Sequence, residues 1–396
     1  MKVYFDNSAT TPVDEEVIKA MIPYFNEKFG NASSLHFFGH EAREAIERSR
    51  EIIAKRLNAE YDELIFTSGG TESDNYALKG IAYAFKEKQK DHLIVSSIEH
   101  PAILNSAKAL EKEGFKVSYL NVDKEGFVDL DQLEKLITDK TVLVSIMQAN
   151  NEIGTIQDLE HIGQICKEKD VIFHSDAVQA FTKVPLDVKK YNLDLVSITA
   201  HKIHGPKGIG ALYIKKELQR RIKKLIDGGG HEFRLRAGTE NVPGAVGFAK
   251  AVEIATTDHI QYMTKLRNYI IKNIFDEIPE CYLNGPDIDT KGDKRLCNNV
   301  NVSIKYIEGE SILLMLSDKG IAVSTGSACA SKNIEPSHVL QAIGRSYEEG
   351  LHGTIRVSLS RKNTYEEADY FLMNLKEIVE KLRNMSPLYR KKQSNV

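Results

Sequence analysis

The chain has 396 residues, enough for two or three domains' worth of hydrophobic core. Apolar residues make up 42% of it and charged residues 28%, which is typical of a globular protein. With 53 basic and 56 acidic side chains the formal charge is −3, so the composition excludes the strongly basic footprint of a nucleic-acid-binding protein.

Targeting and redox signals point to one compartment. The N-terminal residues lack the basic stretch, apolar run and cleavage site of a secretory signal, and no stretch is long and apolar enough to span a bilayer. The four cysteines at positions 166, 281, 297 and 329 form no Cys-x-x-Cys pair, which argues against a disulfide framework or a zinc site. We therefore expect a cytoplasmic protein without a metal, a membrane partner or a nucleic-acid partner.

In chain order, a long helix is predicted between Gly39 and Glu60, followed by alternating strands and helices. Strands are predicted at 63–67, 92–97, 116–122, 141–148, 171–177, 194–199 and 210–214, with helices from about Thr71 and at 101–113 and 158–169 between them. This alternation predicts an α/β protein with a mainly parallel sheet covered by helices on both faces. In such sheets, ligands bind beyond the carboxyl ends of the strands.

After a second long helix at about 255–276 the pattern changes. Strands are predicted at 299–304, 321–325 and 354–359, and helices begin near residues 310, 336 and 364. These elements predict a smaller α+β domain beside the large one. We expect the large domain to cover 13–256 and the small domain to combine 1–12 with 257–396.

Lys202 lies between a predicted strand and a glycine-rich turn that contains Gly205 and Gly208. A lysine held at such a junction can form a Schiff base with an aldehyde cofactor. For a lysine taken alone, a solvated side chain in a loop is the preferred interpretation.

Two further segments follow predicted strands. Ser68-Gly-Gly-Thr-Glu72 joins a strand to a helix whose free N–H groups and positive dipole end suit a phosphate, although a plain capped turn is the alternative. Asp176 ends an apolar strand, where a carboxylate is costly without a cation or donor such as a protonated pyridine nitrogen. A cap or turn aspartate is its simpler interpretation.

Four more side chains stand in positions that suit chemistry. His100 follows a strand end and can stack on an aromatic ring, or it is a structural histidine before a helix. Asn151, in Asn150-Asn-Glu-Ile-Gly154, contacts a ligand or shapes a turn. Cys329 lies among small residues, a setting that fits an exposed nucleophile. Arg356 suits a substrate carboxylate, with an outward-facing surface arginine as the alternative.

Taken together, these segments resemble the cysteine desulfurases of the NifS/IscS-like group, which are pyridoxal-phosphate enzymes of the class-V aminotransferase fold. The resemblance runs nearly the whole chain and its motifs occur in the family's order. They are Tyr4-Phe-Asp-Asn-Ser-Ala-Thr-Thr-Pro12, Asn31-Ala-Ser-Ser-Leu-His36, Gly70-Thr-Glu-Ser73, Glu99-His-Pro101, Asn150-Asn-Glu-Ile-Gly154, Ser175-Asp-Ala-Val-Gln179, His201-Lys-Ile-His-Gly-Pro-Lys207, Arg236-Ala-Gly-Thr-Glu-Asn241 and Gly326-Ser-Ala-Cys329.

The resemblance implies a role for each matching residue. Lys202 would hold pyridoxal phosphate as a Schiff base and move the Cα proton of the substrate, Asp176 would pair with the pyridine nitrogen, and His100 would stack on the ring. Gln179 and Asn151 would contact the ring hydroxyl, and Arg356, helped by Asn31, would bind the substrate carboxylate. The phosphate would be held by Gly70, Thr71, Thr199 and His201, and by Thr239 of a neighbouring subunit in a homodimer.

The implied reaction converts L-cysteine to L-alanine, with Cys329 taking the sulfur as a persulfide. The sulfur would pass to an acceptor protein such as an iron–sulfur scaffold, or into a related thiolation route. Alternatives are a selenocysteine lyase, another pyridoxal-phosphate activity on this fold such as transamination, and a partner protein that keeps the fold for assembly. Cys329 separates a cysteine desulfurase from a transaminase, because a transaminase has no need of such a cysteine.

Overall fold

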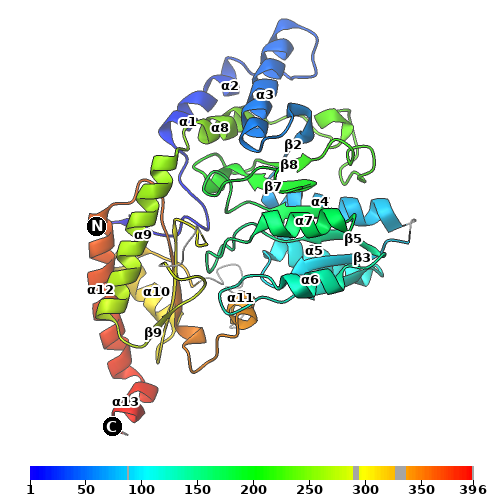
Figure 1. Ribbon diagram of the computed structural model, residues 1–396. Helices are drawn as coiled ribbons and strands as arrows, with labels where there is room; N and C mark the ends of the chain where they lie inside the picture. The colour runs from blue at the N-terminus through cyan, green and yellow to red at the C-terminus, as the bar shows by residue number, and fades with distance from the viewer. Residues whose placement is uncertain (87–88, 289–293, 326–335, 395–396) are drawn as a thin grey trace.

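The computed structural model describes residues 1–86, 89–288, 294–325 and 336–394 (Figure 1). Its central sheet has the strand order β2 (Leu64–Thr67), β8 (Gly210–Ile214), β7 (Leu195–Thr199), β6 (Ile172–Asp176), β5 (Thr141–Ser145), β3 (His92–Ser96) and β4 (Lys116–Leu120). All pairs from β7 to β4 are parallel, whereas β8 is antiparallel to both β7 and β2. The prediction of a mainly parallel α/β sheet is confirmed.

Helices cover both faces of this sheet because successive strand residues point to opposite sides. Phe173 and Val196 pack on one side with residues of α3 (Phe37–Arg56), α7 (Leu159–Glu168) and α8 (Val242–Glu253). Leu143 and Leu195 pack on the other side with α4 (Gly70–Phe85) and α5 (Pro101–Lys112). The remaining helices of this part of the fold are α1 (Glu15–Met21), α2 (Pro23–Asn26) and α6 (Leu130–Leu136).

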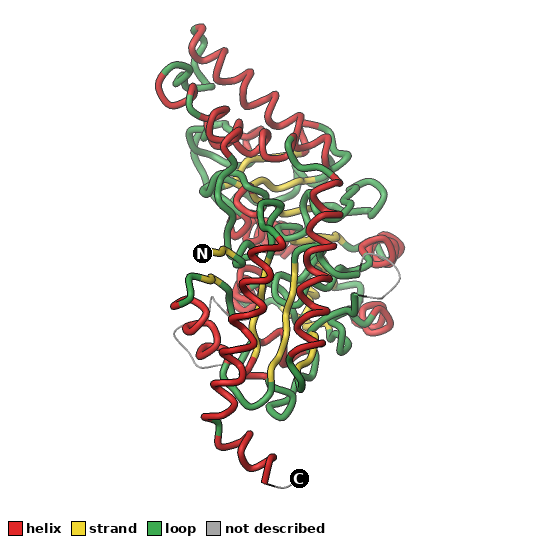
Figure 2. Tube along the Cα trace, turned by 90° about the vertical axis from the view of Figure 1, so that its left-hand side faces the viewer, coloured by secondary structure: helices red, strands yellow, loops and turns green. Residues whose placement is uncertain are grey.

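A second group of elements has its own hydrophobic core. Strands β12 (Thr354–Ser358), β10 (Asn299–Ile304) and β9 (Cys281–Leu283) form an antiparallel sheet, and β1 (Val3–Tyr4) pairs in parallel with β11 (Ile321–Ala322). The long helices α9 (Thr257–Glu277) and α12 (Tyr365–Met385) run side by side against these strands (Figures 1 and 2). The other helices here are α10 (Gly309–Asp318), α11 (His338–Ala342) and α13 (Pro387–Ser394).

Two element boundaries differ from the sequence-based expectation. Helix α3 ends at Arg56, because Asn58 adopts φ of +57° in the left-handed conformation that often follows a helix end. The strand expected at 321–325 is limited to Ile321–Ala322, and Ser324 then forms an isolated bridge with Arg356. Among the residues that the structure describes, no helix has the length and apolar character to cross a membrane.

The ends of the elements around the site follow from local sequence. Helix α5 begins with Pro101 at its first position, and the Nδ1 atom of His100 caps it by accepting a hydrogen bond from the N–H of Ala102 at 3.1 Å. Helix α4 begins after Gly69, whose φ of +155° favours glycine, and it has no side-chain cap. The first N–H groups of α4 are therefore available to a ligand.

Candidate active site

A cavity of about 410 Å³ lies beyond the carboxyl ends of β6 and β7, beside the start of α4. It brings together most of the residues that the sequence singled out, although they come from seven separate stretches of chain. The lining consists of Ser8, Ala9, Gly70, Thr71, Asp74, His100, Met147, Asn151, Asp176, Val178, Gln179, Thr199, His201, Lys202 and Arg356.

Lys202 sits in the short helical turn that directly follows β7. Its Nζ donates hydrogen bonds to the carbonyl oxygens of Ser8 at 2.5 Å and Ala9 at 2.7 Å. The amide of Gln179 also donates to the carbonyl of Ser8, at 2.9 Å. The N-terminal segment thus positions the amine in the cavity.

Asp176 is the last residue of β6 and is buried, with Oδ1 accepting a hydrogen bond from the N–H of Val178 at 2.8 Å. Burial raises the pKa of Asp176 to about 6, against the opposing effect of the charge on Lys202. Burial and repulsion from Asp176 raise the pKa of Asp74 well above its usual range. A cationic group entering the cavity would relieve the cost of this buried acidic pair.

Both cavity histidines are neutral near pH 7. Burial, followed by the charges of Lys202 and His338, lowers the pKa of His100 to about 4. Burial and the charge of Lys202 lower the pKa of His201 to about 4 as well, and His201 Nδ1 lies 3.1 Å from the hydroxyl of Thr10. A neutral imidazole can stack on a ring without a charge penalty.

The start of α4 fits an anion because of its helix N-terminus and its close packing. A Cβ atom on Gly70 would lie 2.7 Å from Cγ2 of Val178, so glycine keeps this turn against the loop after Asp176. The neighbouring Thr199 hydroxyl donates to the carbonyl of Ile209 at 3.1 Å. Thr71 is in the first turn of the helix and lines the same cavity.

Arg356 enters the cavity from β12 and is 3% exposed. One Nη atom donates to Oδ1 of Asp6 at 3.0 Å and the other to the carbonyl of Asn151 at 3.2 Å. Its Nε atom is buried without a hydrogen-bond partner among the described residues. The guanidinium is therefore fixed in position and has an unused donor for a carboxylate.

Three predicted residues fall outside this lining. Thr239 is exposed, and so is Asn31, whose side-chain oxygen accepts hydrogen bonds from the N–H and hydroxyl of Ser33 at 2.9 and 2.6 Å. Cys329 lies outside the residues that the structure describes. Their roles stay predictions.

Sequence reasoning assigned no role to Ser8, Ala9, Asp74, Met147 or Val178, which also line the cavity. Asp74 carried a detectable signal, because it lies one helical turn after Thr71 and therefore on the same face of α4. Ser8 and Ala9 act through backbone carbonyls, so their residue types gave no signal.

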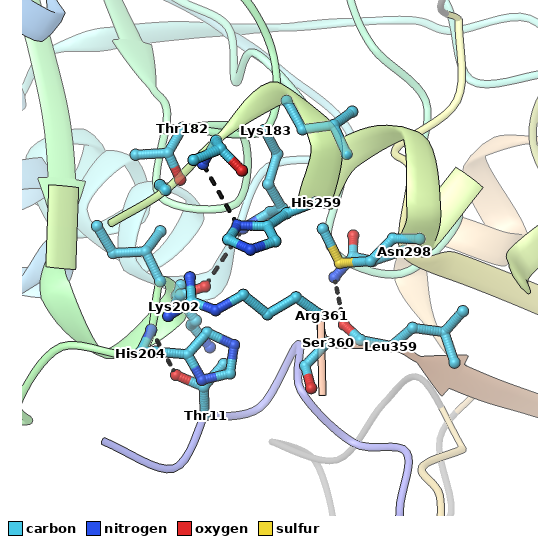
Figure 3. A pocket seen from close by; sticks show the side chains of 15 residues that line it. Thr11, Thr182, Lys183, Lys202, His204, His259, Asn298, Leu359, Ser360 and Arg361 are labelled. Atoms are coloured by element: carbon cyan, nitrogen blue, oxygen red, sulfur yellow. Dashed lines mark hydrogen bonds between the residues drawn. The ribbon is translucent and has the colours of Figure 1, made fainter. Parts of the chain in front are cut away.

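A second pocket, which Lys202 also lines, lies where residues of the two parts of the fold meet (Figure 3). Its volume is about 40 Å³, which suits a few water molecules rather than a cofactor. Arg361, paired with Asp14 at 2.8 Å, extends between His204 and His259. Burial and the Arg361 charge lower the pKa of both histidines, that of His204 to about 4.

The residues of the larger cavity fit pyridoxal phosphate. A lysine amine suits its aldehyde, a buried carboxylate with a raised pKa suits its protonated ring nitrogen, and the uncapped start of α4 suits its phosphate. The volume of about 410 Å³ falls in the range of small-molecule sites.

Comparison with known proteins agrees with this geometry. The aminotransferase class-V family model matches residues 3–371. A cysteine desulfurase IscS from Methanosarcina thermophila is 54% identical and aligns over 98% of this chain and 94% of its own length. Another, from Clostridium botulinum strain Hall, is 52% identical over 98% of this chain and 97% of its own.

Solved structures show the same likeness. A structure described as a NifS-like protein matches with a TM-score of 0.89 and 43% identity, over 96% of this chain and all of the other. A structure described as SspA in complex with cysteine matches with a TM-score of 0.81 and 38% identity, over 92% of this chain and all of that one.

The chain belongs to the class-V aminotransferase family, whose cofactor is pyridoxal phosphate. The fold and the cofactor predicted from the sequence are thereby confirmed. Within the family, the chain is one of the cysteine desulfurases, as its motifs indicated.

Proposed function

We propose that this cavity binds L-cysteine, that Cys329 removes its sulfur, and that the sulfur then passes to an acceptor protein for iron–sulfur cluster assembly. The observation that carries the proposal is the convergence of an amine, a carboxylate and a guanidinium on one cavity, namely Lys202, Asp176 and Arg356. Such a set suits an amino acid bound beside an aldehyde cofactor.

Each cavity residue has a distinct task. Arg356 binds the substrate carboxylate, since its guanidinium is held by Asp6 and the carbonyl of Asn151. Asp176 would pair with the ring nitrogen of pyridoxal phosphate, and the neutral imidazole of His100 would stack on the ring. Asn151 and Gln179 would contact the ring hydroxyl. Gly70, Thr71, Thr199 and His201 would hold the phosphate.

Proton transfer belongs to Lys202. Pyridoxal phosphate, when bound, supplies an electron sink for the charge left as the substrate loses its Cα proton. The Nζ of Lys202 takes that proton, and the carbonyls of Ser8 and Ala9 orient the amine. The helical turn that carries Lys202 fixes its backbone beside the site.

Sulfur transfer belongs to Cys329. Its thiolate attacks the substrate sulfur, so that a sulfur–sulfur bond forms while the carbon–sulfur bond breaks and its electron pair stays with the three-carbon fragment. Protonation of that fragment gives L-alanine. The balance is one L-cysteine and one enzyme thiol converted to one L-alanine and one enzyme persulfide.

We also propose that the active unit is a homodimer in the cytoplasm, in which Thr239 of each subunit reaches the phosphate site of the other. Support comes from an exposed apolar surface where α1, α2 and the start of α3 lie together (Figure 1). Its members are 45–85% exposed: Ile18, Ile22, Phe25, Phe29, Leu35 and Phe37. In each subunit, the proposed large domain covers 13–256 and the proposed small domain combines 1–12 with 257–396. Asn31 is proposed as a further contact to the substrate.

The test is incubation with L-cysteine, a reducing thiol and saturating pyridoxal phosphate, measuring alanine and sulfide in the same samples. Equal amounts of the two products are expected, because each turnover releases one of each. L-serine serves as a control substrate, since it offers no sulfur to Cys329. Absence of alanine would overturn the proposed function.

A further inference from the structure

A buried ion pair outside the cavity joins two distant parts of the chain. Arg50 of α3 and Glu232 are 4% and 7% exposed, and the two Nη atoms of Arg50 donate to the two carboxylate oxygens of Glu232 at 2.6 and 2.9 Å. The guanidinium lies between the rings of Phe66 and Phe233, 4.9 and 4.8 Å from their centroids. This bidentate geometry fixes the relative orientation of both side chains.

The same pair covers the outer edge of β2, which ends the central sheet. Arg50 donates to the carbonyl of Leu64 at 2.6 Å, and Glu232 accepts from the N–H of Phe66 at 2.7 Å. These are backbone groups that a further strand would otherwise pair. Because β2 leads directly into the turn at Gly69 and Gly70, the ion pair fixes the strand that presents the start of α4.

Glu232 begins the segment 232–236, whose first three residues have an unusual backbone conformation. Glu232, Phe233 and Arg234 have φ values of +46°, +54° and +66°, three successive non-glycine residues in the left-handed region. This conformation is unfavourable for L-residues and persists where the surrounding contacts enforce it. The contacts of Glu232 with Arg50 and β2 supply that enforcement.

A second set of contacts ties this segment to α4 itself. Arg236 donates to Glu72 through Nε at 2.9 Å, and the same carboxylate accepts from the N–H of Ser68 at 2.7 Å. The hydroxyl of Tyr76 donates to the carbonyl of Leu235 at 2.6 Å. The segment 232–236 therefore contacts both β2 and α4, the two elements that flank the turn at Gly70.

We propose that Arg50 and Glu232 are positioning residues that preorganise the phosphate-binding turn at Gly70 and Thr71. Among the described residues, the side-chain hydrogen bonds and ring contacts of the pair are with Leu64, Phe66 and Phe233, which do not line the cavity. The pair therefore acts through β2 and through the strained segment. Preorganisation lowers the cost of ordering the turn when the phosphate binds. This inference rests on the proposed placement of the cofactor phosphate at the start of α4.

The test compares two aldehydes that differ in the phosphate group alone. Full-length protein is freed of cofactor and titrated with pyridoxal phosphate and, separately, with pyridoxal, following the visible absorbance of the lysine-bound aldehyde. For Glu232→Gln we expect the dissociation constant for pyridoxal phosphate to rise about tenfold and that for pyridoxal to stay within about twofold of wild type. Glu277→Gln, which breaks the exposed pair with Lys376, is the matched control and leaves both constants unchanged.

The outcomes separate positioning from general loss of structure. The inference is overturned if Glu232→Gln binds both aldehydes more weakly by the same factor. It is also overturned if this variant binds pyridoxal phosphate with wild-type affinity. If Glu232→Gln does not fold, Arg50→Lys decides in its place, because lysine keeps the positive charge but cannot make both hydrogen bonds to Glu232 in the planar arrangement of the arginine. The same selective loss is then expected, and its absence overturns the inference. Failure of wild-type protein to bind pyridoxal phosphate would instead refute the proposed function.

Discussion

The amine of Lys202 is held by the backbone carbonyl of Ser8, 194 residues earlier in the chain. Ser8 reaches this position because β1 pairs with β11 and because the N–H of Ser8 is bound by the hydroxyl of Ser358 at 2.8 Å. The residue proposed to bind the cofactor aldehyde is therefore oriented by a segment packed against the other hydrophobic core.

Replacement of Lys202 by alanine should remove covalent attachment of pyridoxal phosphate. We expect the visible absorbance of the lysine-bound cofactor to be absent and sulfide release to fall by at least about a thousandfold, because the proton acceptor is lost as well. Absorbance spectroscopy of the purified variant checks this. Lys190→Ala, at an exposed pair with Glu160, should retain the wild-type spectrum; a normal spectrum in the Lys202 variant would refute the assignment.

Replacement of Cys329 by serine should separate cofactor binding from sulfur transfer. The variant should keep the visible absorbance and lose sulfide release, since a serine hydroxyl does not form a persulfide under these conditions. Cys281→Ser is the control and should release sulfide at the wild-type rate. Undiminished sulfide production by Cys329→Ser would remove this residue from the mechanism.

Arg356 tests recognition of the substrate carboxylate. Lysine at this position keeps the charge but lacks the planar fork that satisfies Asp6, the carbonyl of Asn151 and a ligand together. We expect Arg356→Lys to raise KM for L-cysteine by about tenfold or more, measured as initial rates of alanine formation. Arg48→Lys on the exposed face of α3 should leave KM unchanged, and an equally small effect at Arg356 would argue for a purely structural arginine.

The raised pKa of Asp176 gives a pH-dependent prediction for the cofactor-free protein. Its pKa of about 6 in the folded protein exceeds the ordinary aspartate pKa of about 4, so the folded state binds the proton more tightly and loses stability as pH rises from about 4 to above 6. Asp176→Asn should therefore stabilise the cofactor-free protein at pH 7 by up to about 3 kcal/mol, with the difference vanishing below about pH 4. Urea unfolding at several pH values measures it.

The contrary result for Asp176 is equally clear. If the free energy of unfolding has the same pH dependence in wild type and in Asp176→Asn, the Asp176 carboxyl carries no desolvation cost. With pyridoxal phosphate bound the ranking should reverse, because the carboxylate then has the ring nitrogen as its partner.

Thr239 tests whether the site is shared between subunits. Thr239→Ala and Lys202→Ala should each give a defective homodimer, the first by weakening phosphate binding. A hybrid dimer combines one Thr239→Ala subunit with one Lys202→Ala subunit. In this hybrid, the Thr239→Ala subunit keeps its own Lys202 and receives an intact Thr239 from its partner. Absorbance titration should find one site per hybrid dimer that binds pyridoxal phosphate with wild-type affinity. If no such site appears, Thr239 acts in the site of its own subunit.

The sequence predicted the central sheet well because its strands are short apolar runs separated by clear helix signals. Helix α8, by contrast, has an almost uniformly apolar composition without a clear polar face, and it was not predicted. The site residues at strand ends, such as Asp176 and His100, were found because parallel strands collect their carboxyl ends at one edge.

The remaining parts of the site depend on tertiary structure. Asp74 lines the cavity because α4 packs against β5 and β7, a relationship that its own sequence neighbourhood does not specify. The tie between Arg50 and Glu232 spans 182 residues and carries no local pattern at all. Contacts of this kind become visible when the fold is known.

The position of the N-terminal segment has a consequence for synthesis of the protein. Residues 3–8 are bound by β11 and by Ser358, so they cannot reach their final place until almost the whole chain has left the ribosome. The central sheet can assemble earlier, from residues 64–214. A nascent chain halted before β12 would therefore carry Lys202 and Asp176 but lack both Arg356 and the anchored carbonyl of Ser8, and desulfurase chemistry should arise late in biosynthesis.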